Sequence, residues 1–351
     1  MDILILDGDG IGPEIAAASA TVLEHVNDQF ALGLTIERRA LGLKTLDREG
    51  TTLPDSVRRA AEAADGIVLA PLSTFDYPER DRGGINASAE FRTGLDLFAN
   101  FRPCRQRVSN GAGPGIDLVV VRENTEGFYA CRTMHAGSGE FMPDASTAFA
   151  MRKITEHASR AIAREAFALA ATRRGRLAVV HKANVLKLSD GLFLKTVRDV
   201  AADYPGITVS EVLVDAAAAL LVREPNQFDV LLTTNMFGDI LSNEAAEIAG
   251  GLGMAPSLNA GLDRAMAQAA HGSAPDIAGM NRANPTGLIL SVAMLLDWLG
   301  RRAGRAELSA AAKAIDVAID LALSNRASCT PDQGGTAGTS EFAQTVIRHC
   351  R

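Results

Sequence analysis

The sequence predicts an α/β fold with a largely parallel central sheet. Short apolar runs alternate with helix-length amphipathic segments, which is the pattern of repeated βαβ units. The chain has 351 residues, longer than most single hydrophobic cores, so two lobes or one large domain is expected. Hydrophobic residues make up 47% of the chain and charged residues 22%, which is typical of a folded globular protein.

The apolar runs and the helical patterns define the expected elements. Strands are expected at residues 3–6, 66–70, 117–121, 177–180 and 229–233. Helices are expected at residues 14–26, 56–64, 147–172 and 288–299. The last two helices are expected to lie in the core or in an interface.

Composition and charge exclude several classes of protein. A formal net charge of −7 argues against non-specific binding to nucleic acid or to an anionic membrane. No apolar run approaches the roughly 18 to 20 residues of a membrane span, and the N-terminus lacks the pattern of a signal peptide. Cys104, Cys131, Cys329 and Cys350 are far apart and form no CxxC pair, which indicates neither a zinc site nor a disulfide framework. We therefore expect a cytoplasmic protein.

A glycine-rich turn, LDGDGIGPE at residues 6–14, lies between the first expected strand and helix. Pro13 suits a first helical turn, and a turn of this kind can cradle a phosphate. It lacks the full GxGxxG spacing and the Lys-Ser/Thr ending of a P-loop, so a purely structural role is equally compatible with it.

Three arginines are candidate anion ligands: Arg92, Arg102 and Arg122, in EFRTG, FANFRP and VVVREN. Guanidinium groups bind carboxylates in a bidentate manner, so three together would suit a di- or tricarboxylic acid. Taken singly, unrelated surface salt bridges are the simpler interpretation.

Asp215, Asp239 and Asn243 are candidate metal ligands. Asp239 and Asn243 are four residues apart in FGDILSNEA, so a helix would present both on one face. Ligands that are all oxygen select a hard cation, Mg²⁺ or Mn²⁺. Acidic residues are also common near helix N-termini, so the spacing alone does not decide.

Tyr129 in RENTEGFY and Lys182 in HKANVLK are candidate proton-transfer groups. Phenol and ammonium groups ordinarily keep their protons at neutral pH, so a catalytic role would need burial, a metal or neighbouring cations. Without that context, both would be packing or surface residues.

The loop HGSAPDIAG at residues 271–279 is a candidate nucleotide site. The carboxylate of Asp276 could accept both ribose hydroxyls of an adenosine and would repel a 2′-phosphate, which favours NAD over NADP. An aspartate that stabilises its own turn is the alternative for Asp276 taken alone.

Taken together and in their order along the chain, these motifs resemble those of the β-decarboxylating dehydrogenase family. The family includes isocitrate, isopropylmalate, homoisocitrate, tartrate and D-malate dehydrogenases. The resemblance covers nearly the whole chain and rests on GDGIGPE, FANFRP, RENTEGFY, HKANVLK, GDILSNEA and HGSAPDIAG. It implies an isopropylmalate-dehydrogenase-like fold with two lobes, a large one from residues 1–98 and 250–351 and a small one from 99–249 with the dimerisation elements. The active site would lie in the cleft between them, in a homodimer or larger assembly.

The resemblance also implies roles for individual residues. Tyr129 and Lys182 correspond to the catalytic pair, and the three arginines correspond to the groups that bind the substrate's carboxylates. Asp215 and Asp239 correspond to ligands of Mg²⁺ or Mn²⁺, with Asn243 as a third, and Lys182 and Asp215 would reach the site from the partner subunit. NAD would bind away from the glycine-rich turn, and the matching positions are Ser73, Thr74, Asn184, His271, Gly272, Ser273, Ala274, Asp276, Ile277 and Asn284.

The implied reaction is an oxidation followed by a decarboxylation. Lys182 helps to remove the hydroxyl proton as hydride leaves C2 of the substrate for the nicotinamide. The metal polarises the new ketone and stabilises the enolate that forms as CO₂ departs, and Tyr129 protonates C3.

Three features depart from the family's pattern. Asn243 stands where most active members carry an aspartate, so weaker metal binding is expected. Gln268 stands where other members of the family often carry an acidic residue, and we expect this change to affect cofactor binding only peripherally. The segment 71–88 lacks the isopropylmalate-type sequence and is nearer in outline to the isocitrate type, with Asn86 and Ser88 as candidate contacts to the substrate's variable group.

We therefore expect an enzyme that uses NAD and a divalent metal to oxidise and decarboxylate an (R)-2-hydroxy polycarboxylic acid. Isocitrate or a homoisocitrate-like acid is the favoured substrate, and tartrate, D-malate or 3-isopropylmalate is the alternative within the family. A non-catalytic regulatory subunit of a heteromeric dehydrogenase is the alternative of another class. Asn243 suggests it, and the presence of both catalytic candidates and both aspartates argues against it.

Overall fold

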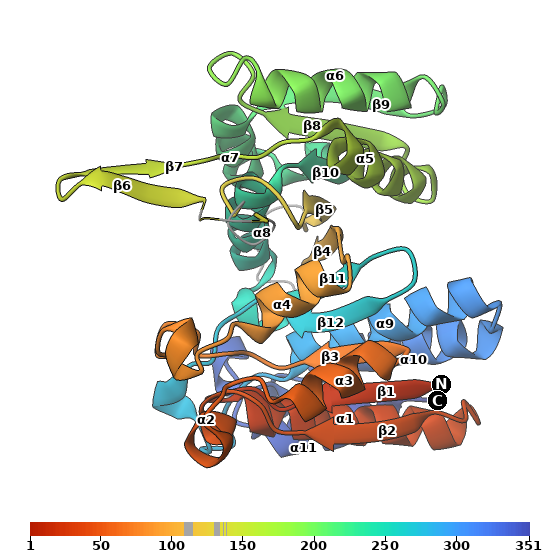
Figure 1. Cartoon of the computed structure of the whole chain (residues 1–351). Helices are drawn as coiled ribbons and strands as arrows, with labels where there is room; N and C mark the ends of the chain where they lie inside the picture. Colours follow the sequence, from red (N-terminus) through yellow and green to blue (C-terminus); the bar gives the residue numbers. More distant parts are fainter. Residues whose placement is uncertain (109–114, 130–133, 136, 138) are drawn as a thin grey trace.

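The computed structural model describes residues 1–108, 115–129, 134–135, 137 and 139–351 (Figure 1). Its centre is a sheet of ten strands, which confirms the α/β class. The strands are β1 (Asp2–Leu6), β2 (Thr35–Arg39), β3 (Gly66–Leu69), β4 (Ala99–Arg105), β5 (Asp117–Glu123), β8 (Arg176–His181), β9 (Thr208–Leu213), β10 (Val230–Thr233), β11 (Pro256–Ala260) and β12 (Ala265–Ala269). In space they follow the order β2-β1-β3-β12-β11-β4-β5-β10-β8-β9.

Two groups of parallel strands make up this sheet and run in opposite directions. β2, β1, β3 and β12 form the first group, and β5, β10, β8 and β9 form the second. Between the groups, β12 pairs with β11, β11 with β4 and β4 with β5, and each of these pairs is antiparallel. The chain thus enters the second group through β4 and leaves it through β11. The residue boundaries expected for two lobes stay a prediction.

Helices cover both faces of each group (Figure 1). They are α1 (Gly12–Gln29), α2 (Leu43–Glu49), α3 (Asp55–Ala63), α4 (Ala87–Gly94), α5 (Glu156–Ala171), α6 (Ser189–Ala201), α7 (Val214–Arg223), α8 (Asn235–Ala249), α9 (Thr286–Ala303), α10 (Ala306–Ser324) and α11 (Thr339–His349). On the first group, α1, α9, α10 and α11 bury one face, and α3 and α4 bury the other. On the second group, α5 and α6 bury one face, and α7 and α8 the other.

The expected elements are confirmed with one correction, which concerns the helix expected at 147–172. The helix α5 begins only at Glu156, and Thr147–Ala150 is a strand, β7, paired with β6 (Glu140–Asp144). Thr155 caps the helix, because its hydroxyl accepts a hydrogen bond from the backbone N–H of Ala158 at 3.2 Å. Upstream of this cap the helical spacing rested on Met151 and Ile154 alone, too few to define a period, and Met151 is 40% exposed.

The glycine-rich turn is a packing element. Gly10 has a φ of 56°, and a Cβ there would lie 2.0 Å from the carbonyl oxygen of Ser273. The backbone N–H of Ile11 donates to that same oxygen at 2.8 Å, and the N–H of Asp9 donates to the oxygen of Pro71 at 2.8 Å. Glycine is therefore required so that the turn can touch the loops that follow β3 and β12.

Two further features bear on the class of protein. Cys104, Cys329 and Cys350 are buried free thiols, and Cys131 lies outside the described residues. Within the part of the chain that the structure describes, no helix is both long enough and apolar enough to cross a membrane.

Candidate active site

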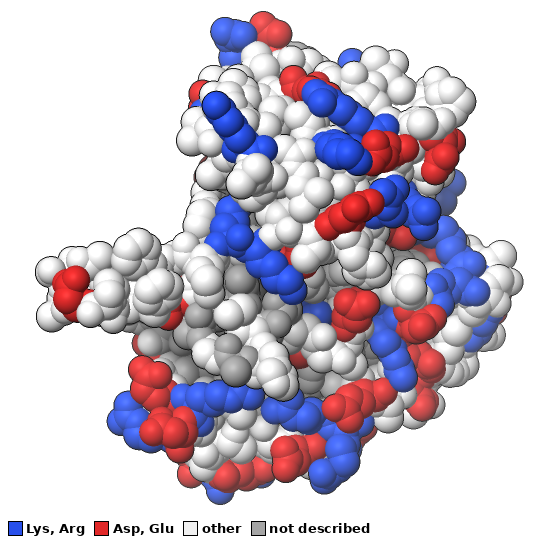
Figure 2. All heavy atoms as spheres, turned by 45° about the horizontal axis from the view of Figure 1, so that its top comes forward, with Lys and Arg blue, Asp and Glu red and all other residues white. Residues whose placement is uncertain are grey.

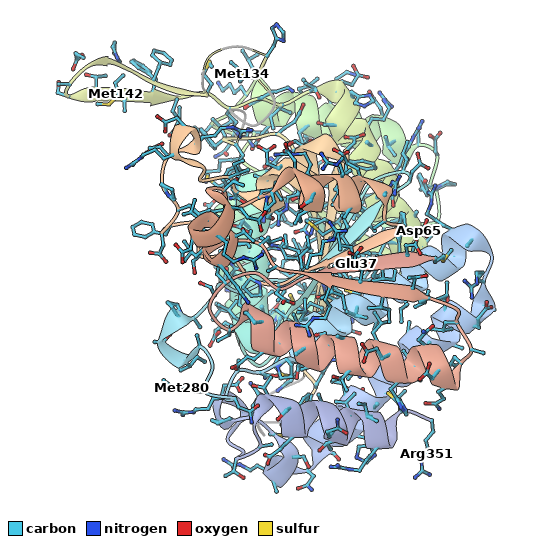
Figure 3. The ribbon with its side chains drawn as sticks, turned by 60° about the horizontal axis from the view of Figure 1, so that its bottom comes forward. Glu37, Asp65, Met134, Met142, Met280 and Arg351 are labelled. Atoms are coloured by element: carbon cyan, nitrogen blue, oxygen red, sulfur yellow. The ribbon has the colours of Figure 1, made fainter. Side chains whose placement is uncertain are left out.

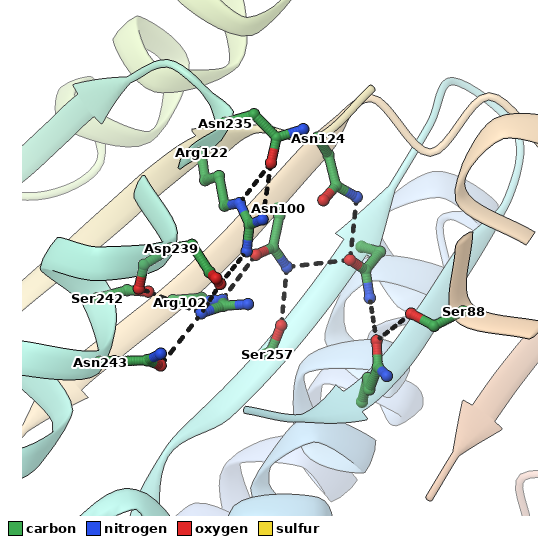
Figure 4. Close-up of polar contacts among 12 residues, drawn as sticks. Ser88, Asn100, Arg102, Arg122, Asn124, Asn235, Asp239, Ser242, Asn243 and Ser257 are labelled. Atoms are coloured by element: carbon green, nitrogen blue, oxygen red, sulfur yellow. Dashed lines mark hydrogen bonds and ion pairs between the residues drawn. The ribbon is translucent and has the colours of Figure 1, made fainter. Parts of the chain in front are cut away.

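A row of polar side chains crosses one face of the sheet where β4 and β11 join its two groups (Figure 4). Because side chains alternate along a strand, Asn100 and Arg102 of β4 point to the same face as Arg122 of β5. Asn259 of β11 and Gln268 of β12 continue the row on that face. The row separates the apolar cluster under α3 and α4 from the one under α7 and α8.

Amide side chains fix the two buried arginines. The side-chain oxygen of Asn100 accepts a hydrogen bond from Nε of Arg102 at 2.7 Å. The oxygen of Asn235, at the start of α8, accepts from Nε and Nη2 of Arg122 at 3.0 and 2.7 Å. Asn100 donates in turn to Asn259 at 3.1 Å. These contacts set the orientation of both guanidinium planes.

Asp239 of α8 lies between the two arginines. Its Oδ1 is 3.1 Å from Nη1 of Arg102 and forms an ion pair with Nη1 of Arg122. The arginine side chains are 7% and 3% exposed, whereas that of Asp239 is 36% exposed. Two cations therefore share one carboxylate, and the local excess of positive charge suits a further anion.

The arginines also control the ionisation of Asp239. Burial alone would raise the pKa of this carboxyl group, but Arg122, Arg102 and Arg92 lower it below its ordinary value. Burial lowers the pKa of Arg102, an effect that the charge of Asp239 opposes. Asp239 is therefore a carboxylate at neutral pH, which is the form that binds a cation.

Arg92 and Ser88, both on α4, converge on the side-chain oxygen of Gln268. A guanidinium N–H of Arg92 donates to it at 3.0 Å, and the hydroxyl of Ser88 donates at 3.1 Å. Gln268, expected to touch cofactor binding only peripherally, thus lies against two candidates for substrate binding. Asn86 accepts a hydrogen bond from the N–H of Ala89 at 3.1 Å, so its side chain caps α4.

Tyr129 follows the turn after β5 and lies beside the arginines. The buried carboxylate of Glu123 accepts hydrogen bonds from the backbone N–H groups of Thr125 and Glu126 at 2.7 and 2.9 Å and fixes this turn. The guanidinium carbon of Arg122 is 6.0 Å from the centre of the Tyr129 ring. The phenol is thus held near the substrate-binding candidates by a cation over its ring.

Lys182 and Asp215 form an ion pair with each other, apart from this cluster. Lys182 follows β8, which is two strands from β5, so its backbone lies roughly 10 Å or more from that of Arg122. The fully buried Asp190 accepts a hydrogen bond from the backbone N–H of Lys182 at 2.6 Å and positions it. Asp215 is 64% exposed. Within one chain, the pair does not meet Asp239.

The expected nucleotide positions lie beside the glycine-rich turn. A cavity of about 280 Å³ is lined there by residues that include His271, Gly272, Ala274, Ile277 and Asn284. Burial lowers the pKa of His271, so its ring is neutral at pH 7. Its Nε2 atom is buried and has no hydrogen-bond partner among the described residues. Because Nδ1 donates to the carbonyl oxygen of Gly272 at 3.0 Å, Nε2 of the neutral ring is an acceptor and fits a ligand that donates a hydrogen bond, as the amino group of an adenine does.

The remaining nucleotide candidates divide into a buried pair and three exposed residues. The hydroxyl of Ser73 donates to that of Ser273 at 2.7 Å, which ties the loop after β3 to the loop after β12. Thr74, Asp276 and Asn184 are exposed.

The glycine-rich turn itself does not offer a phosphate site of the P-loop kind. The backbone N–H groups of Asp9, Ile11 and Gly12 already donate to carbonyl oxygens of the protein at 2.8 Å. Such a site needs those groups free, so the structural interpretation of the turn is favoured.

Asp239 and Asn243 share one face of α8, as their spacing predicts. The side-chain oxygen of Asn243 lies 3.4 Å from a guanidinium N–H of Arg102. Over the described ranges, no three histidine, cysteine, aspartate or glutamate side chains gather as metal ligands would. One carboxylate and one amide fit the oxygen chemistry of Mg²⁺ or Mn²⁺, but they give an incomplete set. The other ligands would have to come from water, from the substrate or from a second chain.

Sequence reasoning missed the amides that position the arginines. Period-two alternation in FANFRP places Asn100 and Arg102 on one face of a strand, and this signal could have identified Asn100. Asn235 and Asn259 carry no such signal. Their partners come from strands that lie more than 100 residues away in sequence.

Comparisons with known proteins agree with this geometry. A sequence model of the isocitrate/isopropylmalate dehydrogenase family matches residues 2–346. The chain is 42% identical to an isocitrate/homoisocitrate dehydrogenase of Thermus thermophilus, with 98% of this chain and 97% of that protein covered. It is 39% identical to a 3-isopropylmalate dehydrogenase of Pseudomonas putida, with 99% and 98% covered. The crystal structure of an isocitrate dehydrogenase from Methylococcus capsulatus superposes with a TM-score of 0.87 at 34% identity, over 100% of this chain and 99% of that one.

The lowered pKa of Asp239 predicts a pH-dependent stability effect. A carboxyl group whose pKa falls on folding stabilises the native state fully above its unfolded pKa, and that contribution is lost as the pH drops through the folded pKa. Asp239→Asn should therefore lower the free energy of unfolding by roughly 1 to 3 kcal/mol at neutral pH, with solvent screening favouring the lower end. The difference from wild type should shrink below about pH 4.

Urea unfolding of both proteins at a fixed concentration and at several pH values tests this prediction. Asp203→Asn, at an exposed aspartate, is the matched control and should change little. A deficit in Asp239→Asn that stays constant from neutral to acidic pH would contradict the assignment.

Proposed function

The chain belongs to the isocitrate/isopropylmalate dehydrogenase family of oxidative decarboxylating enzymes, and we propose that it uses NAD and Mg²⁺ or Mn²⁺ to convert an (R)-2-hydroxy polycarboxylic acid. The observation that carries the proposal is the pair of buried arginines around the ionised Asp239. This arrangement combines anion binding with a cation ligand in one site. The proposal includes a cytoplasmic location, which the four widely separated cysteines favour.

The substrate's carboxylates would be bound by Arg92, Arg102 and Arg122. Arg102 and Arg122 are held rigid by amides, which lowers the entropy lost when they engage a ligand. Ser88 and Gln268 make the neighbouring surface polar, and this favours isocitrate or a homoisocitrate-like acid over an isopropyl group. Tartrate, D-malate and 3-isopropylmalate remain the alternatives within the family.

The metal would be held by Asp239 and Asn243 together with Asp215 of a second copy of the chain. Bound there, it would polarise the C2 oxygen and stabilise the enolate that follows loss of CO₂. Asn243 brings an oxygen but no charge, so this site would bind a cation less tightly than one with a third carboxylate.

Two residues would carry protons. Lys182 of a second copy would accept the proton of the substrate hydroxyl, directly or through water, as hydride leaves C2. Its ion pair with Asp215 holds both groups together, so one segment of the second copy would deliver the proton acceptor and the metal ligand. Tyr129 of the first copy would donate a proton to C3, since Arg122 keeps its ring beside the substrate arginines.

NAD would bind in the cavity lined by His271 and Asn284. The free Nε2 atom of His271 would contact the adenine, and Asp276 would accept the ribose hydroxyls. Ser73 and Ser273 hold the two loops that border this side of the site together.

A homodimer is part of the proposal, because neither the metal site nor the proton acceptor is complete in one chain. The hairpin of β6 and β7 projects from the body of the molecule and is largely uncharged (Figure 2). Phe141 and Phe149 stack on it at 5.2 Å, and both are 51% exposed. Met142 lies on the same hairpin and is also exposed (Figure 3). An apolar projection of this kind suits burial against a second copy.

The regulatory-subunit alternative rests on Asn243 alone. The chain carries Tyr129, Lys182 and Asp239, to which the proposal gives the proton-transfer and metal-binding roles, and this favours an active enzyme. Activity in the purified protein without any other chain would exclude the alternative.

A substrate panel tests the proposed function. With Mn²⁺ and NAD, isocitrate or homoisocitrate should react at least about tenfold faster than 3-isopropylmalate, because Ser88 and Gln268 would leave an isopropyl group in a polar environment. NADH formation and CO₂ release are the measurements, and the same panel with NADP is the cofactor control. Turnover of 3-isopropylmalate far above that of every tricarboxylate would overturn the substrate assignment.

Mixing of inactive variants tests the shared site. Lys182→Met and Asp239→Asn should each be inactive, but heterodimers contain one site with both native residues. An exchanged mixture should therefore regain about a quarter of wild-type activity. The control is a mixture of Asp239→Asn and Tyr129→Phe, which should stay inactive because both residues serve the same copy. Sites confined to one chain predict no recovery in either mixture.

A separate prediction concerns the affinity of the metal site for Mn²⁺. Asn243→Asp should lower the Mn²⁺ concentration for half-maximal rate, because a third negative ligand strengthens binding of a hard cation. Asn243→Ala, which removes the oxygen, should raise it. Equilibrium dialysis of Mn²⁺ should change in the same directions. An unchanged or higher requirement in Asn243→Asp would show that this side chain is not a ligand.

A further inference from the structure

A cavity of about 500 Å³ lies on the face of the sheet opposite to the polar row. We call it the back groove. Its floor includes Phe101 and Pro103 of β4 with Leu258 of β11. Along β4 these residues alternate with Asn100 and Arg102, so the floor is the reverse side of the strand that holds a substrate-binding arginine. Helices α5 and α9 form the walls.

The interior of the back groove is apolar. Leu169 of α5, Met294 and Trp298 of α9 and Leu262 of the turn before β12 line it. Trp298 is the single tryptophan of the chain. The guanidinium of Arg302 lies over its ring, 5.1 Å from the centre, which holds the indole in place. This lining suits an aliphatic or aromatic side chain.

Charged groups of both signs border the same groove. Glu165 of α5 has no hydrogen bond or ion pair with any described residue, although its side chain is partly buried. Burial raises the pKa of this carboxyl group, and Arg301 and Arg302 across the groove oppose that rise. Arg301 pairs with Asp297 at 2.9 Å and Arg302 with Asp263 at 2.6 Å, both near the surface. An unpaired carboxylate therefore stands opposite two arginines.

We propose that the back groove binds a free α-amino acid with an apolar side chain. The ammonium group would pair with Glu165, the carboxylate would bind Arg301 and Arg302, and the side chain would enter the pocket beside Trp298. The carboxylate of Glu165, the two guanidinium groups and the apolar lining would then each contact one part of the ligand. Its volume lies within the range of small-molecule sites. The proposal involves none of the residues assigned to the reaction, so it stands or falls separately from the proposed function.

Other ligand classes match the groove less well. A fatty acid or another simple carboxylate would place a second negative charge near Glu165. A simple amine would not engage the two arginines, whose guanidinium groups have N–H donors beyond those that contact Asp297 and Asp263. An α-amino acid carries its ammonium and carboxylate groups on the same carbon atom. It can therefore contact Glu165 and the arginines together, because all three side chains lie at the border of the same apolar pocket.

Fluorescence of Trp298 reports on this site directly, since it is the only tryptophan in the chain. Titration of the full-length protein with L-leucine and with L-phenylalanine should give a saturable change in tryptophan emission, and calorimetry should give the same affinity. Serine, which lacks an apolar side chain, should produce no saturable change. Absence of binding by both apolar amino acids would overturn the proposal.

Modified ligands and a matched pair of variants test the charged contacts. N-acetyl-leucine lacks the ammonium and leucinamide lacks the carboxylate, so each should bind about tenfold more weakly than leucine, or worse. Glu165→Gln should weaken leucine binding to a similar degree, whereas Glu156→Gln, an exposed glutamate on the same helix, should not. Equal affinity of leucine and N-acetyl-leucine would show an apolar pocket without amino-acid recognition. The two modified ligands decide the matter on wild-type protein if Glu165→Gln does not fold.

Discussion

The burial of two guanidinium groups in the middle of the sheet is the constraint on which the site depends. Arg102 and Arg122 are charged and almost fully buried, and an unpaired buried charge would be strongly destabilising. Asn100, Asn235 and Asp239 supply the compensating contacts. Because those partners are polar too, the core on this face cannot be continuous. It is divided into two apolar clusters, and the polar row between them is the part of the face open to a charged ligand.

The same charge arrangement is consistent with the proposed sharing of the reaction centre between two copies of the chain. Asp239 is already shared by two arginines, so it alone would bind a dication weakly, and Asn243 adds no charge. Lys182 and Asp215 neutralise each other at a distance from it. In the proposed dimer, that neutral pair would bring a carboxylate and a proton acceptor together to Asp239 of the other copy. Assembly would then supply both functions without concentrating unpaired charge in the free chain.

The sequence predicts elements well where a pattern is local and repeated. The strands at β1, β5 and β10 follow from continuous apolar runs, and α9 from its long helical period. The boundary of α5 depends on one cap at Thr155, which the apolar spacing does not reveal. The ordered motifs point to the arginines and to Asp239, and the structure brings Arg102, Arg122 and Asp239 into contact, whereas the sequence gives no indication of Asn235. Its role depends on the pairing of β10 with β5, which brings together residues more than 100 positions apart.

Strand β4 links the two faces of the molecule in a way that follows from strand geometry alone. Arg102 faces the polar row, while its neighbours Phe101 and Pro103 form the floor of the back groove. The side chains alternate on one backbone, so a displacement of β4 moves both sets together. A ligand in the groove can change substrate binding only if it favours one position of this strand over another. Because α5 packs on the second group of strands and α9 on the first, a ligand that spans both helices would favour the spacing of the two groups that best fits its own length.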